Sequence, residues 1–193
     1  MLYTRADHSI VESAIVPNMD EIDAAILQLL QTDARLSNRE LARRLGVAPS
    51  TALERVRALE RRGVITGYRA QVNLEALGRG VEAFVTVRVS PLSRAVITAF
   101  QGSIAALPEV LQVFVVAGDN DFLVHVAVPS IERLHAFLMD RLSQRREIIG
   151  FQTVVIFQRT ASPVVARLPE PAGSAPATTT APRASGGPGR RAR

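Results

Sequence analysis

The 193-residue sequence contains no cysteine, no tryptophan and only three histidines, and these absences exclude several kinds of chemistry. Without cysteine there is no disulfide, no thiolate nucleophile and no cysteine-ligated zinc. The histidines, His8, His125 and His135, have no spacing to one another or to acidic residues that is typical of a metal site. A Walker loop, a Gly-rich dinucleotide loop and a serine nucleophile elbow are also missing. We therefore expect no catalytic residues, no metal and no cofactor.

Long apolar runs are absent as well. No stretch of eighteen apolar residues occurs, and the first residues do not join a basic segment to an uninterrupted apolar one. A membrane-spanning helix needs about 20 mostly apolar residues, and a secretory signal needs that basic and apolar pair. We therefore expect a cytoplasmic protein without a membrane partner. With 47% apolar and 21% charged residues, the chain can form one ordinary domain or two small ones.

Charge of both signs is present, but it is distributed unevenly. All 23 basic residues are arginine. Residues 37–63 carry seven arginines and three glutamates, whereas residues 81–160 carry seven arginines and seven acids. Concentrated positive charge over residues 37–63 favours an acidic partner for that segment alone. Residues 161–193 are rich in Pro, Ala, Gly, Ser and Thr, a composition that predicts an unfolded tail.

Residues 19–66 have the apolar periodicity of helices. Apolar side chains recur at helical spacing over residues 20–33, with acids in the first turn, where the helix dipole favours them. A second, short helix is predicted over residues 37–46, because Ser37 and Glu40 have the spacing of a capping box and a glycine ends the segment. Residues 1–18 lack such a pattern and are predicted to be a flexible extension.

A third helix is predicted from Pro49 to about Gly63. Its apolar stripe consists of Ala52, Val56 and Leu59, at positions i, i+4 and i+7. Three helices with a tight turn between the second and third predict a helix-turn-helix.

The second helix of a helix-turn-helix pair lies in the DNA major groove, and flanking basic residues contact phosphates. With the apolar stripe facing inward, steps of about 100° place Ser50, Glu54, Arg57 and Arg61 on the outer face. An ordinary solvated arginine face is the alternative, but the localised charge and the turn favour DNA. The candidate DNA-binding residues are Arg39, Arg43, Arg44, Ser50, Thr51, Glu54, Arg55, Arg57 and Arg61.

The second half of the chain predicts a separate α+β domain. Residues 64–70 are interpreted as a short β segment, and residues 67–80 as a β linker. Over residues 81–160 the predicted order is β-α-β-β-α-β, the ferredoxin-like split βαβ arrangement. Its strands are predicted at 83–89, 110–117, 122–128 and 151–158, and its helices at 97–107 and 131–142.

The turn between the two central strands is a candidate ligand site. Its residues are Gly118, Asp119, Asn120, Asp121 and Phe122. Two carboxylates beside a glycine can receive a ligand ammonium group, although Asp and Asn in a hairpin turn also satisfy backbone donors. The phenyl ring of Phe122 is either a wall of such a pocket or part of the core.

These residues resemble the Lrp/AsnC family of bacterial and archaeal transcription regulators. The resemblance rests on DEIDAAILQLL, SNRELARRLGV, RVRALERRGVITGYRA and ALGRGVEAFV, and continues to about Arg159. It implies a winged helix-turn-helix domain, a β linker and an ACT-like effector domain, assembled as dimers or dimers of dimers. In the family a Gly-x-x-Asp-aromatic segment lies at the subunit interface where amino-acid effectors bind. This sequence departs from the family pattern at Ala48, where serine is usual, and at Asn120, where an aromatic residue is usual.

Taken together, the sequence predicts a sequence-specific transcription regulator whose DNA affinity is set by a small effector, an amino acid or a related metabolite. The expected assembly is a homodimer or higher oligomer, acting on nucleoid DNA at an imperfect palindrome with half-sites roughly 10 or 20 bp apart. Two alternatives stay open. One is a tetrapyrrole decarboxylase, since proteins similar to the family include such enzymes; the other is a ligand-binding partner module that does not bind DNA alone.

Overall fold

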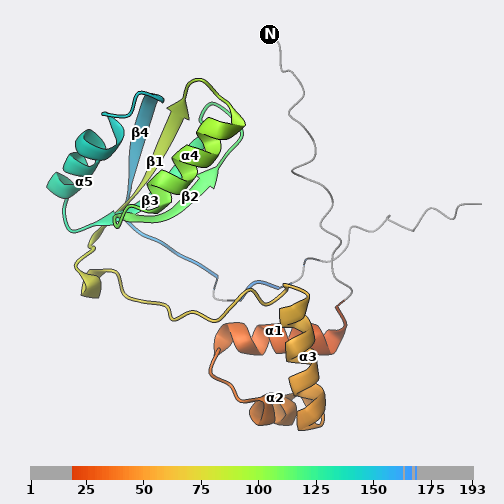
Figure 1. Ribbon diagram of the computed structural model, residues 1–193. Coiled ribbons are helices and arrows are strands. Elements are labelled where there is room, and N and C mark those ends of the chain that lie inside the picture. The colour runs from red at the N-terminus through yellow and green to blue at the C-terminus, as the bar shows by residue number, and fades with distance from the viewer. Residues whose placement is uncertain (1–18, 163, 167, 169–193) are drawn as a thin grey trace, which may run out of the picture. The chain divides into compact units, whose positions relative to one another are not determined.

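The computed structural model describes residues 19–162, 164–166 and 168 (Figure 1). The predicted extension over residues 1–18 and nearly all of the predicted tail lie outside the described residues. The chain divides into two compact units, with the boundary between Thr66 and Gly67. Within the described residues, no helix is long and apolar enough to cross a membrane.

The first unit contains the three predicted helices, α1 (Glu21–Thr32), α2 (Asn38–Leu45) and α3 (Pro49–Arg61). Asp20 caps α1, because its carboxylate accepts a hydrogen bond from the Asp23 backbone N–H at 2.9 Å. The Ser37 hydroxyl caps α2 by accepting from the Glu40 N–H at 3.2 Å. The two caps satisfy backbone donors that have no partner within the helix, so each helix begins where the sequence predicts.

The turn between α2 and α3 depends on two residues. Gly46 adopts a left-handed conformation with φ of 68°, which costs a glycine little and other residues more. Ala48 is the N-cap of α3 and provides no side-chain hydrogen bond. The third helix therefore begins without the cap that serine would supply.

The core of the first unit lies where the three helices meet. Ile26 of α1, Leu41 of α2, and Ala52 and Leu59 of α3 are at most 1% exposed. Val56 is also buried, which confirms the predicted inner stripe of α3.

The predicted short β segment over residues 64–70 is wrong for this structure, since residues 64–70 contain no strand. The backbone N–H groups of Val64 and Ile65 both donate to the carbonyl of Leu59, at 2.9 and 3.2 Å. Both side chains pack against the helical core. Val64 and Ile65 therefore close the C-terminal end of α3, and their two backbone N–H groups are not available to a β ladder. The predicted β linker is likewise not a strand, and it contains a single 3-10 turn, Glu75–Leu77.

The second unit has the predicted β-α-β-β-α-β order. Its elements are β1 (Val81–Val89), α4 (Arg94–Ala105), β2 (Val110–Val115), β3 (Phe122–Val128), α5 (Ile131–Phe137) continued by a π-helical turn (Leu138–Leu142), and β4 (Ile148–Ile156). The sheet is antiparallel with strand order β2-β3-β1-β4. This order confirms the predicted ferredoxin-like arrangement.

Both helices of this unit lie on the same side of the sheet (Figure 1). Strand alternation directs one set of side chains toward them, including Val85 and Val87 of β1 and Val124 and Val126 of β3, all fully buried. Phe100 of α4 packs on Phe122, with ring centroids 4.4 Å apart. The core of the second unit therefore fills the space between its helices and one sheet face.

The opposite sheet face has no helix over it among the described residues. The register places Phe84 beside His125 and Val154, and Phe114 beside Leu123. Phe114 is 41% exposed and Val154 is 59% exposed. This open face of the sheet thus presents large apolar side chains to solvent.

Candidate nucleic-acid interface and effector turn

The outer face of α3 carries the residues that the sequence assigns to DNA reading. Ser50, Glu54, Arg57 and Arg61 are exposed, and Thr51 beside them is partly exposed. Within the described part of the chain, Arg57 and Arg61 form no ion pair, and neither does Arg39 on α2. These three guanidinium groups remain available to an acidic partner.

Two further candidate arginines on α2 are held by one carboxylate. The Glu40 carboxylate accepts from Arg43 at 2.7 and 2.8 Å and from Arg44 at 2.8 Å. These bonds, that of Arg43 first, lower the pKa of Glu40 to about 2. The predicted capping box is thus half formed: Ser37 caps the helix, but the Glu40 side chain contacts the arginines. Any phosphate contact by Arg43 or Arg44 must compete with Glu40.

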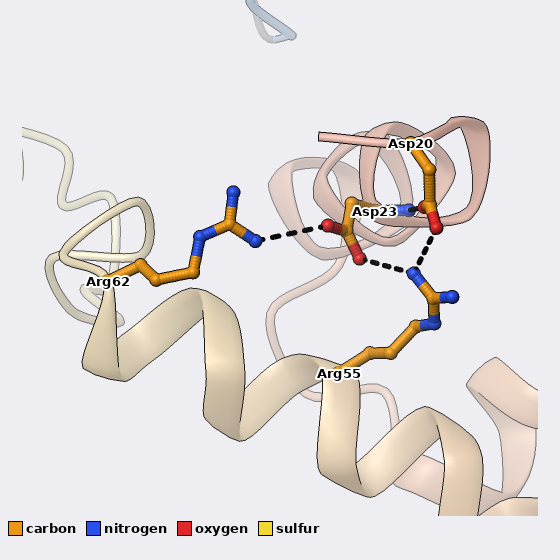
Figure 2. A network of polar contacts seen from close by, with 4 residues as sticks. All are labelled: Asp20, Asp23, Arg55 and Arg62. Atoms are coloured by element: carbon orange, nitrogen blue, oxygen red, sulfur yellow. Dashed lines mark hydrogen bonds and ion pairs between the residues drawn. The ribbon is translucent and has the colours of Figure 1, made fainter. Parts of the chain in front are cut away.

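Arg55, which the sequence places among the candidate DNA-binding residues, is turned toward α1 and away from the outer face of α3. Its guanidinium donates to Asp23 of α1 at 3.0 Å and also to Asp20 (Figure 2). The side chain is only 31% exposed. The 100° rotation from the outer face turns Arg55 toward α1, where two carboxylates engage it.

Asp23 is the centre of this contact between α1 and α3. Its side chain is 8% exposed and also accepts from Arg62 at 3.3 Å, so two guanidinium groups converge on it (Figure 2). A buried carboxylate is tolerated where charged donors satisfy it. The backbone N–H of Asp23, and after it Arg55, lower the pKa of Asp20. Periodicity alone assigned Asp20 and Asp23 to the first turn of a helix and missed their ion pairs with α3.

The turn at residues 118–121 joins β2 to β3, as predicted. Gly118 has φ of 134°, and a Cβ added there would meet no atom within 4 Å. Asp119 is exposed and has no hydrogen-bond partner among the described residues, and Asn120 is partly exposed. The turn therefore offers one carboxylate with open surroundings.

Asp121 is bound to the main chain more closely than the sequence indicates. Its Oδ2 accepts from the Val89 N–H at 2.8 Å, and its own N–H donates to the Val87 carbonyl at 3.0 Å. Its carbonyl accepts from Val116 at 2.9 Å. Asp121 therefore anchors the turn to the end of β1, with Oδ1 left for other contacts.

Phe122, the last of the candidate effector residues, is a core residue, which is one of the two alternatives that the sequence leaves open. Its side chain is 0% exposed and faces Phe100. The side chain points to the helix-covered face because Phe122 has the same parity along β3 as buried Val124.

The second unit contains two histidines, of which one is buried and one is exposed. His125 is 6% exposed; its Nε2 lies 2.9 Å from Oε2 of Glu82, and its ring lies 4.8 Å from that of Phe84. His135 is exposed on α5. No cluster of three or more His, Cys, Asp or Glu side chains suited to a metal occurs among the described residues.

Comparison with known proteins identifies the family of this chain. Residues 19–66 match the model of a winged helix-turn-helix DNA-binding domain, and residues 82–164 match that of the Lrp/AsnC ligand binding domain. The chain is 38% identical over 149 residues to the HTH-type transcriptional regulator AldR of Mycolicibacterium smegmatis. These aligned residues cover 76% of this chain and 87% of the relative. The chain belongs to the Lrp/AsnC family. It is a DNA-binding transcriptional regulator with a ligand-binding domain.

Other relatives agree with this assignment. The leucine-responsive regulatory protein of Escherichia coli K12 is 34% identical over 141 residues, covering 73% of this chain and 86% of that protein. A transcriptional regulator of Neisseria meningitidis, solved as an L-Met complex, superposes with a TM-score of 0.70 at 28% identity, covering 75% and 93% of the two chains. E. coli AsnC superposes with a TM-score of 0.67 at 27% identity, covering 79% and 99%. These Lrp/AsnC relatives are transcriptional regulators and not enzymes, so they do not support the alternative of a decarboxylase.

Proposed function

We propose that this Lrp/AsnC regulator reads a palindromic DNA site as a homodimer, through the outer face of α3, and that an amino acid bound at the turn 118–121 changes its DNA affinity. The DNA assignment rests on which arginines have an ion-pair partner and which do not. Arg39, Arg57 and Arg61 are without ion-pair partners in the described structure, whereas Arg55 is held by α1. Ser50 and Thr51 stand at the N-terminal end of α3, where a recognition helix contacts base edges.

Base reading and phosphate contact are separable by substitution. Arg57→Ala and Ser50→Ala are expected to change the preferred bases, at about 1 to 3 kcal/mol for each lost contact. Arg43→Ala is expected to weaken all sequences equally and to reduce the slope of log K against log salt by about 0.9. Arg146→Ala, an exposed residue of the second unit, makes the same change of charge and serves as the matched control.

The experiment is fluorescence anisotropy titration of DNA at several salt concentrations, together with selection of bound sequences. It also tests whether the purified protein binds DNA without another regulator. If Arg57→Ala and Ser50→Ala keep the wild-type preference, the outer face of α3 is not the reading surface. If the wild type binds no DNA alone, the protein is a partner module.

Dimerisation is supported by the open face of the sheet. Exposed Phe114 and Val154 form part of an apolar surface that α4 and α5 do not cover. Exposed apolar patches of this kind mark interfaces, and a two-fold symmetric dimer presents two reading heads to a palindrome. Val154→Asp is expected to yield monomers in sedimentation at micromolar concentration. Val165 is also exposed, and the control substitution Val165→Asp is expected to leave the dimer intact. A monomeric wild type contradicts the proposal.

The effector assignment rests on the chemistry of the turn. A zwitterionic amino acid needs acceptors for its ammonium group and donors for its carboxylate. Asp119 offers an unpartnered carboxylate among the described residues, and Oδ1 of Asp121 is a second acceptor. Both lie beside Gly118, where an added Cβ would meet no atom within 4 Å. The N. meningitidis relative, whose structure contains L-Met, makes an amino acid the first ligand class to test.

Asp119→Asn is expected to abolish the effector response in a mobility-shift titration while leaving effector-free DNA binding intact. Asp121→Asn retains an oxygen that can accept from Val89 and removes only the charge, so it separates ligand contact from anchoring of the turn. Exposed Glu132→Gln is the control for charge. If Asp119→Asn and Asp121→Asn both respond as the wild type does, the effector binds elsewhere.

A further inference from the structure

The described segment 164–166, which follows the last strand, belongs to the first compact unit together with the helix-turn-helix. The side-chain amide of Gln31, on α1, holds this segment by its main chain. Oε1 of Gln31 accepts from the Val165 N–H at 2.8 Å, and Nε2 of Gln31 donates to the Val165 carbonyl at 3.1 Å. Both backbone polar groups of Val165 are therefore bound to one side chain of α1.

The contact between Gln31 and Val165 is specific in its geometry. Nε2 of Gln31 also donates to the carbonyl of Leu27 at 3.2 Å, which fixes the orientation of the amide on the helix. Val165 contributes its main chain alone, because its side chain is 75% exposed. A residue in an antiparallel sheet exchanges the same two bonds with its neighbour. Gln31 thus provides an attachment point on α1 for the C-terminal part of the chain.

The sequence that follows this attachment point is basic. Nearly all of it lies outside the described residues, and the match to the family's ligand-binding domain ends at residue 164. Beyond Val165 the chain has five arginines and a single acid, Glu170. The first arginine is Arg167, and the other four, which we call the tail arginines, are Arg183, Arg190, Arg191 and Arg193. A second basic segment is therefore attached to the unit that already contains the arginines of residues 37–63.

The chain beyond Val165 is long enough to reach DNA bound by the first unit. About 25 residues separate Val165 from Arg190, and a chain spans at most about 3.5 Å per residue, or about 85 Å here. A folded unit of about 45 residues has a radius of gyration of about 9 Å, so this reach exceeds the dimensions of the unit several times. Two basic segments on one unit repel each other, and a polyanion relieves this repulsion by neutralising both.

We propose that the tail arginines, attached to α1 through Gln31, bind the phosphate backbone of DNA beside the sequence that the helix-turn-helix reads. The contact adds affinity for every DNA sequence and contributes no base preference. Arginine suits this role because its planar guanidinium donates two hydrogen bonds to one phosphate group. The proposal rests on DNA binding by this regulator, and not on which residues of α3 read the bases.

The first test is fluorescence anisotropy titration of a random-sequence DNA duplex with the full-length protein at several salt concentrations. One variant replaces all tail arginines: Arg183→Gln, Arg190→Gln, Arg191→Gln and Arg193→Gln. Each phosphate contact contributes about 0.9 to the slope of log K against log salt, so we expect this variant to reduce the slope by about 2 to 4. Selection of bound sequences with the same variant is expected to return the wild-type preference.

A control variant makes the same change of charge on the second unit. It replaces four exposed arginines there: Arg94→Gln, Arg133→Gln, Arg141→Gln and Arg146→Gln. We expect this variant to keep the wild-type slope, because the slope counts phosphate contacts and not the net charge of the protein.

A second pair of variants tests the attachment to α1. Gln31→Ala removes both bonds to Val165. Gln28→Ala removes an exposed amide of the same helix that has no side-chain hydrogen bond among the described residues. We expect hydrogen exchange to show a protected Val165 N–H in the wild type and in Gln28→Ala, and an unprotected one in Gln31→Ala. Gln31→Ala is also expected to weaken binding of random-sequence DNA about two- to tenfold, because the tail arginines are then less concentrated near the DNA.

The proposal is overturned if the tail variant keeps the wild-type slope, or if the control variant on the second unit reduces the slope as much. It is equally overturned if Gln31→Ala binds DNA as tightly as Gln28→Ala does, because the attachment then plays no part. Failure of the α3 assignment gives a different result. In that case Arg57→Ala keeps the wild-type sequence preference, while the tail variant still reduces the slope.

Discussion

The contact between α1 and α3 yields a prediction about the stability of the DNA-binding unit. Asp23→Ala removes a carboxylate that two arginines share. Arg55 retains Asp20 as a partner, but Arg62 loses the contact at 3.3 Å. We expect the first unit to unfold more easily while the second unit is unaffected.

The magnitude follows from the exposure of the partners. Breaking a fully buried ion pair costs about 3 to 5 kcal/mol. Here Asp23 is 8% exposed, but Arg55 and Arg62 are 31% and 33% exposed, so water can solvate them again and reduce the cost. Alanine also recovers about 0.5 kcal/mol of helix propensity. We therefore expect Asp23→Ala to lower the free energy of unfolding of the first unit by about 2 kcal/mol.

The assay must distinguish the two units. Urea unfolding followed by NMR of isoleucine methyl groups does so, because Ile26 lies in the first core and Ile104 in the second. Glu21→Ala is the matched control, since it removes an exposed acid from the same helical turn. We expect Glu21→Ala to cost about 0.5 kcal/mol, the effect of the helix dipole alone. A double-mutant cycle with Arg62→Gln isolates the pair energy.

The reasoning is refuted if Asp23→Ala costs no more than Glu21→Ala. It is equally refuted if the transition reported by Ile104 moves as far as that reported by Ile26, because the ion pairs lie wholly within the first unit.

Three further predictions concern the helix-turn-helix. Ala48→Ser is expected to raise the stability of the first unit by about 1 kcal/mol in urea unfolding, because serine supplies the missing N-cap of α3; no gain would show that another group caps the helix. Gly46→Ala is expected to lower it by about 1 kcal/mol, since φ is 68° there, and an unchanged midpoint would argue against the left-handed turn. Glu40 has its pKa lowered to about 2 from 4.5, so its stabilising effect is present above pH 4.5 and lost as the pH falls toward 2. Thermal unfolding between pH 5 and pH 2 should therefore show a smaller loss of stability for Glu40→Gln than for the wild type, and equal losses would contradict the Glu40 contacts.

Local signals made most of the fold predictable. Ser37 and Gly46 define α2 because caps act within one turn of chain, and strand alternation from Ala83 to Val89 directly encodes the buried face of β1. Residues 64–70 misled the prediction for the opposite reason. Their β propensity is genuine, but a strand needs a neighbour, and Val64 and Ile65 donate to Leu59 instead.

The site was predictable in outline, and its errors concern contacts between distant residues. Helical geometry placed Arg57 on the outer face of α3, but it did not show that Arg55 pairs with carboxylates on α1. The motif pointed to Asp121, yet its bond to Val89 connects positions 32 residues apart.

Selection of bound DNA from a random library by the purified full-length protein, repeated with amino acids present, tests the central claim most directly. We predict enriched sequences with two-fold symmetry, half-sites roughly 10 or 20 bp apart, and a change in the recovered fraction when an effector amino acid is added. Recovery of sequences no different from the starting library, or of sites without a dyad, would contradict a homodimeric regulator that reads DNA through α3.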